Sequence, residues 1–515
     1  GKKIRLPDAP DPLPSSIRDL ARPYRAFWQP CWSSPDTTRI AIENILEILA
    51  AEPDRVSINM DVNDMGGYCE CQQCLRAING KRNISNYADY SELYWKWVND
   101  VATAVCAKYP GIIFRAIAYC GVLAAPSFKL HPNVLPRLCI ELPTLLDEDV
   151  GPKKLALIQE WSQKASSLDL YDYMHGINFF LIPRIYFRSH SKLVANMVQK
   201  YNLNAAYYES DGETAFQGPQ QQLLVRILWN PNLDVEKFLH DWYVDAVGEK
   251  AAPWLAKYFD FWEAYWTGQD IRKTSWYASV GNVYMALGEI PTHTYALKRS
   301  DMKRLRGWME KVVELAEAPG QKARAQEMME LFVFSEDACQ ALFSEIFQPD
   351  ASLTNVDDAV ELLQAVPQAL AAAKRVVNSP YAALCEQSIK RILPAAISSI
   401  GKIIPYLADP RIQNELTKLL TLPDLPMELG AQIRIWQGAK PENLIVNGSM
   451  EAESPLPRML WNSTPGVRDS TYASDGKYAY KVNNTCLEFR HPVTPGKSYL
   501  FMCDLFIPTG SGEGR

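Results

Sequence analysis

Several features that would define a function class are missing from this sequence of 515 residues. No strand-like run is followed by a GxGxxG or GxxxxGK[ST] loop, so the phosphate-binding signature of nucleotide-binding sheets is lacking. No apolar run reaches the roughly 18 residues that a membrane-spanning helix needs. Basic residues are in slight deficit, and the formal net charge of −6 argues against nucleic acid or an anionic membrane as the main partner. We therefore expect no nucleotide, flavin or other cofactor.

Short apolar runs alternate with helical periodicity from about residue 20 to residue 210. A chain of this length predicts two to four domains, and this alternation is typical of a parallel α/β sheet. The clearest helical patterns cover 36–51, 87–109 and 153–167. The predicted strands are 24–32, 55–62, 112–120, 137–142, 167–174 and 204–210.

Polar side chains follow nearly all of these predicted strands at their carboxyl ends. They are acids, amides and tyrosines: Asp61, Asn63, Asp64, Tyr119, Glu141, Asp172, Tyr173 and Glu209. In a (β/α)8 barrel such strand ends form one rim around one pocket, and barrel enzymes carry their catalytic residues there. Because no phosphate loop is present, a TIM-barrel-like catalytic domain is favoured over a nucleotide-binding sheet.

The sequence changes character twice after this region. The pattern becomes helical after about residue 216, and short strand-like runs with Gly, Pro and Asn turns follow near the end of the chain. We therefore predict a (β/α) barrel domain over 1–215, a helical domain over 216–440, and an incomplete, carbohydrate-binding-like β-sandwich over 441–515.

Three stretches carry a resemblance to a known family. They are SINMDVNDMGGYCECQQC (57–74), AIAYCGVLAAPSFKLHPNVLPRL (116–138) and LLVRILWNPNLDVEKFLHDWYVDAVGEKAAPWL (223–255). Together they resemble glycoside hydrolase family 163, over roughly residues 1 to 265. The resemblance implies an endo-β-N-acetylglucosaminidase that cuts the chitobiose core of complex N-glycans. Separately, NLIVNGSMEAE near the C-terminus resembles the opening of carbohydrate-binding jelly rolls.

The resemblance also implies a numbering of the barrel strands. Residues 24–31 would be strand three, 55–62 strand four and 204–210 strand eight, so the chain would lack the first two strands. An open parallel sheet exposes apolar edges that favour aggregation. We therefore expect either preceding residues or a companion chain to supply the missing strands, and further residues to complete the β domain.

Glycoside cleavage needs an acid for the leaving oxygen and a second group at the oxocarbenium-like centre. When the sugar carries a 2-acetamido group, that group can serve as the nucleophile while a carboxylate orients it. We assign Asp64 and Glu209 to catalysis, although each acid alone could equally be a solvated loop residue or a helix cap. The predicted substrate contacts are Asn63, Asp61, Tyr119, Glu141, Asp172 and Tyr173. Trp229 is predicted to anchor the helix that follows the last strand.

The run Cys69, Cys71 and Cys74 has three interpretations. A zinc site needs four ligands, and the run supplies three with no obvious fourth nearby. A redox pair needs Cys-x-x-Cys at a helix start in a thioredoxin-like unit, which is absent. The third interpretation is a loop support, by packing, disulfide or partial metal, that fixes the turn carrying Asp64. Cys31, like other cysteines in apolar contexts, is interpreted as a small buried hydrophobe.

Two function classes remain open. The first is a retaining glycoside hydrolase, endo-acting on N-acetylglucosamine-containing N-glycans, with acetamido assistance as one route. The alternative is a non-catalytic glycan-binding protein built on the same barrel. Either class predicts a glycan or glycoprotein partner, no nucleic acid and no membrane span, in a secreted, periplasmic or cell-surface location.

Overall fold

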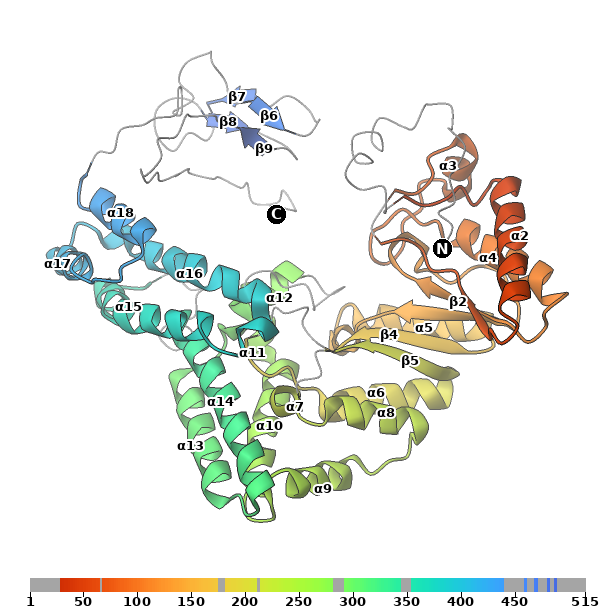
Figure 1. Cartoon of the computed structure of the whole chain (residues 1–515). Helices are drawn as coiled ribbons and strands as arrows, with labels where there is room; N and C mark the ends of the chain where they lie inside the picture. The colour runs from red at the N-terminus through yellow and green to blue at the C-terminus, as the bar shows by residue number, and fades with distance from the viewer. Residues whose placement is uncertain are drawn as a thin grey trace. The chain divides into compact units, whose positions relative to one another are not determined.

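The computed structural model describes residues 28–64, 67–174, 181–210, 214–280, 291–343 and 353–439, together with four short strands between 458 and 488 (Figure 1). The chain divides into two compact units. The first unit comprises Gly1–Leu353 and Gln368–Ile400, and the second comprises Thr354–Pro367 and Gly401–Arg515. The predicted domain boundaries at 215 and 440 stay predictions.

The first unit is a mixed α/β structure around a five-stranded parallel sheet. Its strands stand in sequential order with no switch in direction: β1 (Ser57–Asn59), β2 (Ile113–Ala118), β3 (Val134–Cys139), β4 (Leu168–Tyr173) and β5 (Leu203–Glu209). Sequential parallel order is what a (β/α) barrel requires, because each strand then pairs with the next one along the chain. In the described residues these strands form an open sheet with β1 and β5 at its edges.

One of the six predicted strands is wrong in its described part. Residues 28–34 form no strand. Pro30 has no N–H to donate to a ladder, and Trp32 packs on Tyr94 with ring centroids 4.9 Å apart. The apolar side chain of Trp32 therefore belongs to the hydrophobic core and not to a strand. The strand predicted over 137–142 exists, but it lies three residues earlier, as β3.

The two faces of the sheet differ in burial. Side chains alternate along each strand, so Phe114, Ala116 and Ala118 of β2 lie on a buried face. The opposite face holds Ile113, 37% exposed, and Tyr207 of β5, 48% exposed. We call this second side the open face.

Helices of the first unit cover the buried face, and their residues join the strand residues in one hydrophobic core. Figure 1 shows α6 and α8 beside β5, and their residues contact that strand. These helices are α2 (Pro35–Ala51), α4 (Ser91–Cys106), α5 (Gly151–Lys164), α6 (Phe187–Lys200) and α8 (Gln220–Trp229). The shorter elements between them are α3 (Gln72–Ile78), η1 (Cys120–Val122), η2 (Leu142–Leu146) and α7 (Thr214–Gln217). The three predicted helices correspond to α2, α4 and α5.

Two buried tryptophans connect this core to the loop after β2. Trp95 on α4 and Trp161 on α5 pack edge to face with centroids 4.8 Å apart. Their indole N–H groups donate to the carbonyl oxygens of Val122 and Leu123, at 3.0 Å each. A buried indole N–H needs such a partner. Core packing therefore fixes the backbone just beyond Tyr119. Trp229, by contrast, is 92% exposed, so its prediction as a helix anchor was wrong.

A helical region follows the sheet in sequence, as predicted, and packs within the same unit. Its helices are α9 (Val235–Val247), α10 (Ala252–Thr267), α11 (Gln269–Arg272), α12 (Ser275–Val280), η3 (Pro291–Thr294), α13 (Arg299–Leu315), α14 (Pro319–Ala341), η4 (Ala382–Cys385) and α16 (Glu386–Ile400). Helix α15 (Val356–Val377) spans the boundary between the units. None of the described helices combines the length and the apolar character needed to cross a membrane.

The second unit contains η5 (Gly401–Tyr406), α17 (Pro410–Leu419) and α18 (Met427–Trp436). Its described strands form two antiparallel pairs: β6 (Arg458–Leu460) with β9 (Cys486–Glu488), and β7 (Val467–Asp469) with β8 (Ala479–Lys481). The predicted β character of the C-terminal segment is therefore present. Packing of two sheets into a sandwich is not shown.

Candidate functional site

The carboxyl ends of β1 to β5 meet at one edge of the parallel sheet, which we call the rim. Asp61, Asn63 and Asp64 follow β1, Tyr119 follows β2 and Glu141 follows β3. Asp172 and Tyr173 end β4, and Glu209 ends β5. All predicted site residues therefore lie along the rim.

Asp64 is held by Tyr119, whose hydroxyl donates to Asp64 Oδ1 at 3.0 Å. Burial, with a contribution from neighbouring Cys120, raises the pKa of Tyr119, so its hydroxyl stays protonated as a donor. The residue before Asp64 is fixed through its backbone, because the N–H of Asn63 donates to Gln29 Oε1 at 3.1 Å and Gln29 Nε2 donates to Asn63 O at 2.6 Å. These contacts position the loop that carries Asp64.

The side chain of Asn63 is committed to this same loop, because its Nδ2 donates to Trp28 O at 2.6 Å. Asp61 is exposed in part, yet desolvation by its neighbours raises its pKa, with the Asn59 side chain and Arg137 opposing the shift. Asn63 thus acts as a positioning residue, and Asp61 remains accessible beside it. Their predicted roles as substrate contacts stay predictions.

Glu209 is held at the other edge of the sheet by a tyrosine that the sequence analysis did not select. The hydroxyl of Tyr171 donates to Glu209 Oε1. The Tyr171 ring stacks on Tyr207 with centroids 4.9 Å apart, and it meets Tyr173 edge to face at 5.4 Å. Tyr171, Tyr173 and Tyr207 form one aromatic group on the open face, which we call the tyrosine platform. Its signal in the sequence is the period-two spacing of 169–173, which places Tyr171 and Tyr173 on the same side of β4.

A charged pair supports the platform from the open face. Arg137 lies 2.7 Å from Asp169 Oδ2, and its guanidinium sits over the Tyr207 ring at 5.4 Å. Planar guanidinium groups stack on aromatic faces in this way. Tyr171 and Arg137 together therefore orient the Tyr207 ring.

Glu141 and Asp172 are buried, in contrast to Asp64. Glu141 lies 3.3 Å from Arg184, and the side chains are 0% and 1% exposed. Asp172 Oδ1 accepts the N–H groups of Leu142 at 3.1 Å and Tyr173 at 2.9 Å, while its Oδ2 has no hydrogen-bond partner among the described residues. Burial, reinforced by Glu141 and opposed by Arg184, raises the pKa of Asp172 to about 7.

Lys154 joins the buried network of Glu141, Asp172 and Arg184 through a contact with η2. Lys154 donates to Thr144 Oγ1 at 2.7 Å, and burial lowers its pKa to about 8 although Glu141 favours its charge. Arg184 also donates to the carbonyl oxygen of Tyr173 at 3.2 Å. In this structure the network holds η2 and the end of β4 in place. The assignment of Glu141 and Asp172 to substrate contact stays a prediction.

Asp64 and Glu209 stand at the ends of the first and last strands of the sheet. Four interstrand spacings amount to roughly 19 Å along a flat sheet, and curvature shortens that separation. The two acids therefore belong to one rim but to separate tyrosine-bound positions. Their predicted convergence on a single pocket stays a prediction.

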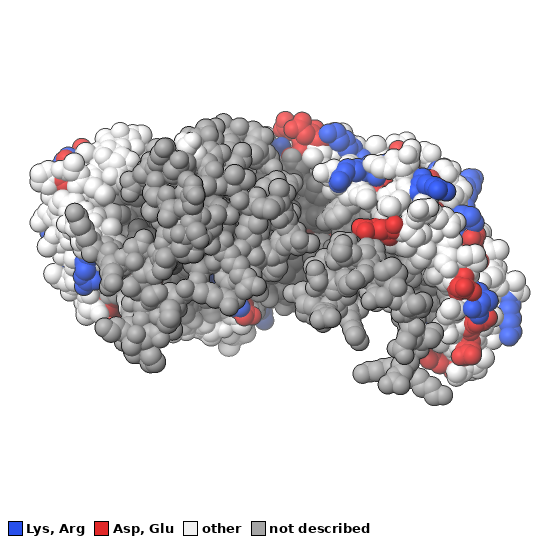
Figure 2. Space-filling model, turned by 90° about the horizontal axis from the view of Figure 1, so that it is seen from above, with Lys and Arg blue, Asp and Glu red and all other residues white. Residues whose placement is uncertain are grey.

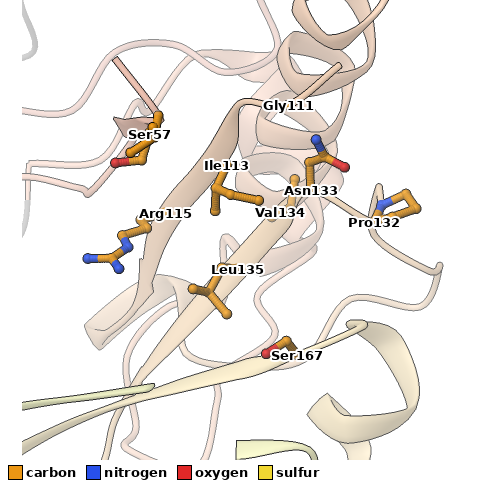
Figure 3. A pocket seen from close by; sticks show the side chains of 10 residues that line it. Ser57, Gly111, Ile113, Arg115, Pro132, Asn133, Val134, Leu135 and Ser167 are labelled. Atoms are coloured by element: carbon orange, nitrogen blue, oxygen red, sulfur yellow. The ribbon is translucent and has the colours of Figure 1, made fainter. Parts of the chain in front are cut away.

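A shallow pocket of about 330 Å³ lies at the opposite, amino ends of the strands. Figure 3 shows Ile113, Arg115 and Leu135 of the open face together with Asn133 and Ser167 of the loops that precede β3 and β4. Arg115 is the single charged side chain in its lining. The residues that line this pocket include no acid–base pair, and (β/α) barrels carry their catalytic residues at the carboxyl ends of the strands. We therefore place the candidate site at the rim.

The cysteine run lies beside the Asp64 loop, and the thiols of Cys31, Cys69, Cys71 and Cys74 all lie within 4.8 Å of one another. The expectation that no fourth ligand lies nearby was therefore wrong. Cys31 precedes Cys71 by 40 residues and is brought to it because Gln29 N donates to Gly67 O at 3.0 Å. Cys31 is partly buried against the hydrophobic core, which agrees in part with its interpretation as a small hydrophobe, but it also belongs to this thiol cluster.

The described surface carries charges of both signs. In Figure 2, basic and acidic side chains are interspersed over the described part of this face. Mixed charge agrees with the small net charge of the sequence. On this face the described residues form no one-sided basic stripe of the kind that nucleic-acid-binding proteins present.

Comparison with known families gives a match over part of the chain. Residues 15–260 match a family described as a domain of unknown function, DUF4838. No curated protein matches. Among solved structures the chain is similar to a "GH138 enzyme targeting pectin rhamnogalacturonan II", at 10% identity and a TM-score of 0.29, with 86% of this chain and 69% of that chain covered. A TM-score this low supports no conclusion about fold or activity. The family 163 resemblance and the jelly-roll resemblance stay predictions.

Proposed function

We propose that this chain is a glycoside hydrolase that cleaves N-acetylglucosamine-containing glycans, with endo action on N-glycans and retention at the anomeric carbon. The observation that carries the proposal is the pair Asp64 and Glu209, each bound by a tyrosine hydroxyl at the rim of a sequentially ordered parallel sheet. The resemblance of 57–74, 116–138 and 223–255 to glycoside hydrolase family 163 supports the substrate class.

The chemistry needs two acidic functions. One carboxyl group protonates the glycosidic oxygen as the bond breaks, and the other stabilises the positive charge that develops at the anomeric carbon. In an acetamido-assisted route, the substrate's own carbonyl oxygen attacks that carbon and the second carboxylate holds the amide N–H. A tyrosine hydrogen bond orients a carboxylate for either role, as Tyr119 does for Asp64 and Tyr171 for Glu209.

The tyrosine platform suits the apolar face of a sugar ring. Tyr207 is 48% exposed, and its contacts with Tyr171 and Arg137 fix the orientation of its ring. A rigid aromatic surface binds a ring at a small entropic cost, because few rotatable bonds become ordered. The same platform would serve the alternative function, a non-catalytic glycan-binding protein.

The deciding experiment measures turnover and binding in the same variants of the full chain. Substrates are complex N-glycans with an intact chitobiose core, and aryl β-N-acetylglucosaminides with good leaving groups. We expect Asp64→Asn and Glu209→Gln to lower kcat/KM for the N-glycan by about 10²- to 10⁴-fold. Glu47→Gln, an exposed acid on α2 away from the rim, is the matched control and should keep full activity.

The aryl substrates assign the two roles, because a good leaving group needs little protonation. The variant that lacks the proton donor should keep more activity on the aryl glycoside than on the N-glycan. Full turnover in both acid variants would refute the site. Glycan binding without any turnover in the unmodified chain would favour the alternative function.

A further inference from the structure

Four cysteine thiols from two separate segments converge beside the Asp64 loop. Cys31 comes from the turn before α2, Cys69 and Cys71 from the segment after β1, and Cys74 from the first turn of α3. The Sγ atom of Cys31 lies 3.8 Å from that of Cys71 and 3.8 Å from that of Cys74. All four Sγ atoms lie within 4.8 Å of one another.

These distances match a tetrahedral metal site and not a pair of disulfides. A zinc–sulfur bond of about 2.3 Å places the corners of a regular tetrahedron about 3.8 Å apart. A disulfide would bring two sulfur atoms to about 2.05 Å. Cys31, Cys69, Cys71 and Cys74 form no disulfide with one another in this structure. The arrangement therefore has room at its centre for one ion.

The surroundings provide donors for thiolate sulfur. The backbone N–H of Cys74 points to Cys71 Sγ at 3.5 Å. The Ser33 hydroxyl lies 3.1 Å from Cys74 Sγ and 3.2 Å from Cys31 Sγ. Such contacts orient metal ligands and offset the negative charge of four thiolates around a divalent ion.

Three packed aromatic rings, Tyr68, Tyr90 and Trp32, lie beside the cysteine cluster. Tyr68 stacks on Tyr90 with centroids 4.7 Å apart, and Trp32 meets Tyr68 at 5.8 Å. The Tyr90 hydroxyl donates to the carbonyl oxygen of Cys69 at 3.2 Å. The loop that presents the sulfur atoms is thereby attached to the hydrophobic core.

We propose that Cys31, Cys69, Cys71 and Cys74 bind one Zn²⁺ as a closed, four-thiolate structural site. Binding is an acid–base exchange, in which four thiols release four protons to solvent and no electrons are transferred. Four sulfur ligands complete the tetrahedron, so no coordination position stays open for substrate. Soft thiolates in this geometry select zinc among the common non-redox metals.

The site would join the two segments that frame Asp64. One segment carries Gln29, which exchanges two hydrogen bonds with the backbone of Asn63. The other continues from Gly67 to α3. Zinc would thus act on the candidate site by positioning, and the proposal stands whether or not the chain is a glycosidase.

The first test uses the unmodified full chain, purified under reducing conditions from zinc-supplemented culture. Elemental analysis should find one zinc per chain. X-ray absorption at the zinc edge should give four sulfur neighbours at about 2.3 Å. Three sulfur neighbours with a nitrogen or oxygen would overturn the four-thiolate site. Iron in place of zinc, two disulfides detected by mass, or four titratable thiols without metal after incubation with Zn²⁺ would overturn the site.

The second test uses variants. We expect Cys31→Ser and Cys71→Ser to lower the zinc retained against a competing chelator at least about tenfold. Cys106→Ser is the matched control, because Cys106 is buried on α4 and its thiol donates to Ile112 O at 3.8 Å. It should retain one zinc. Equal zinc retention in Cys31→Ser and Cys106→Ser would overturn the four-cysteine assignment, and the absorption measurement decides the case if a variant does not fold.

Discussion

Asp172 offers a direct measure of how the buried network below the rim contributes to stability. Its carboxyl group has an ordinary pKa of 3.8, which burial raises to about 7 in the folded chain. The folded state therefore keeps a proton that the unfolded chain releases above about pH 4. Since the folded state binds more protons in that window, the free energy of unfolding falls as the pH rises through it.

The magnitude follows from the size of the shift. Each pKa unit corresponds to about 1.4 kcal/mol, so the rise from 3.8 to about 7 amounts to ~4 kcal/mol between pH 4 and pH 8. The stabilisation is complete below the unfolded pKa and is lost as the pH approaches the folded one. For a cooperative unit of roughly 400 residues, ~4 kcal/mol corresponds to a shift of ~5 °C in Tm.

The perturbation is Asp172→Asn, which keeps an oxygen to accept the Leu142 and Tyr173 N–H groups but removes the titration. Thermal unfolding of both proteins at half-unit steps from pH 4.5 to pH 8.5 gives the difference in Tm as a function of pH. Because part of the stabilisation is already lost at pH 4.5, we expect the unmodified chain to lose ~4 °C relative to the variant across this range. Asp54→Asn, on an exposed turn, is the control and should follow the unmodified chain. Parallel curves for Asp172→Asn and the unmodified chain would refute the reasoning.

Two further substitutions test the packing around the rim. Arg184→Met should destabilise the first unit by about 3–5 kcal/mol in urea unfolding, because it removes the buried guanidinium that lies 3.3 Å from the Glu141 carboxyl group. Adding Glu141→Gln should restore part of that loss, and no recovery would contradict an ion-pair role. Trp95→Ala should cost about 3–5 kcal/mol as a fully buried ring with a satisfied N–H. Trp229→Ala, on a fully accessible ring, should stay within about 0.5 kcal/mol, and equal losses would contradict the assigned burial.

Much of the sheet could be predicted because its strands have strong local signals. The apolar run at 112–120 and the alternating run at 167–174 correspond to β2 and β4. The segment 24–32 misled the prediction, because in its described part Trp32 packs on Tyr94 of α4 from a loop. Apolar content alone does not distinguish a strand from an ordered loop that is buried by tertiary packing.

The positions of Asp64 and Glu209 at the rim were predictable, because each residue lies at or after the carboxyl end of a strand. The candidate site was not predictable where the partner comes from elsewhere in the fold. Arg184 reaches Glu141 from a loop before α6, and Cys31 reaches Cys71 across 40 residues, so no local pattern marks either residue. Tyr171 is the intermediate case. Alternation along β4 placed it beside Tyr173, but only the structure shows its hydrogen bond to Glu209.

The alternation of the strands has a consequence for how mutations in this chain should behave. By coincidence of numbering and register, even-numbered positions such as Phe114, Leu138 and Leu170 face the helices in β2, β3 and β4. Odd-numbered positions such as Tyr171 and Tyr207 face the open side. Burial follows this alternation throughout β2, so saturation mutagenesis of β2 should give different results at even and odd positions. Even positions would reduce the amount of folded protein in the cell, whereas odd positions would leave abundance largely intact and change what the surviving protein can bind.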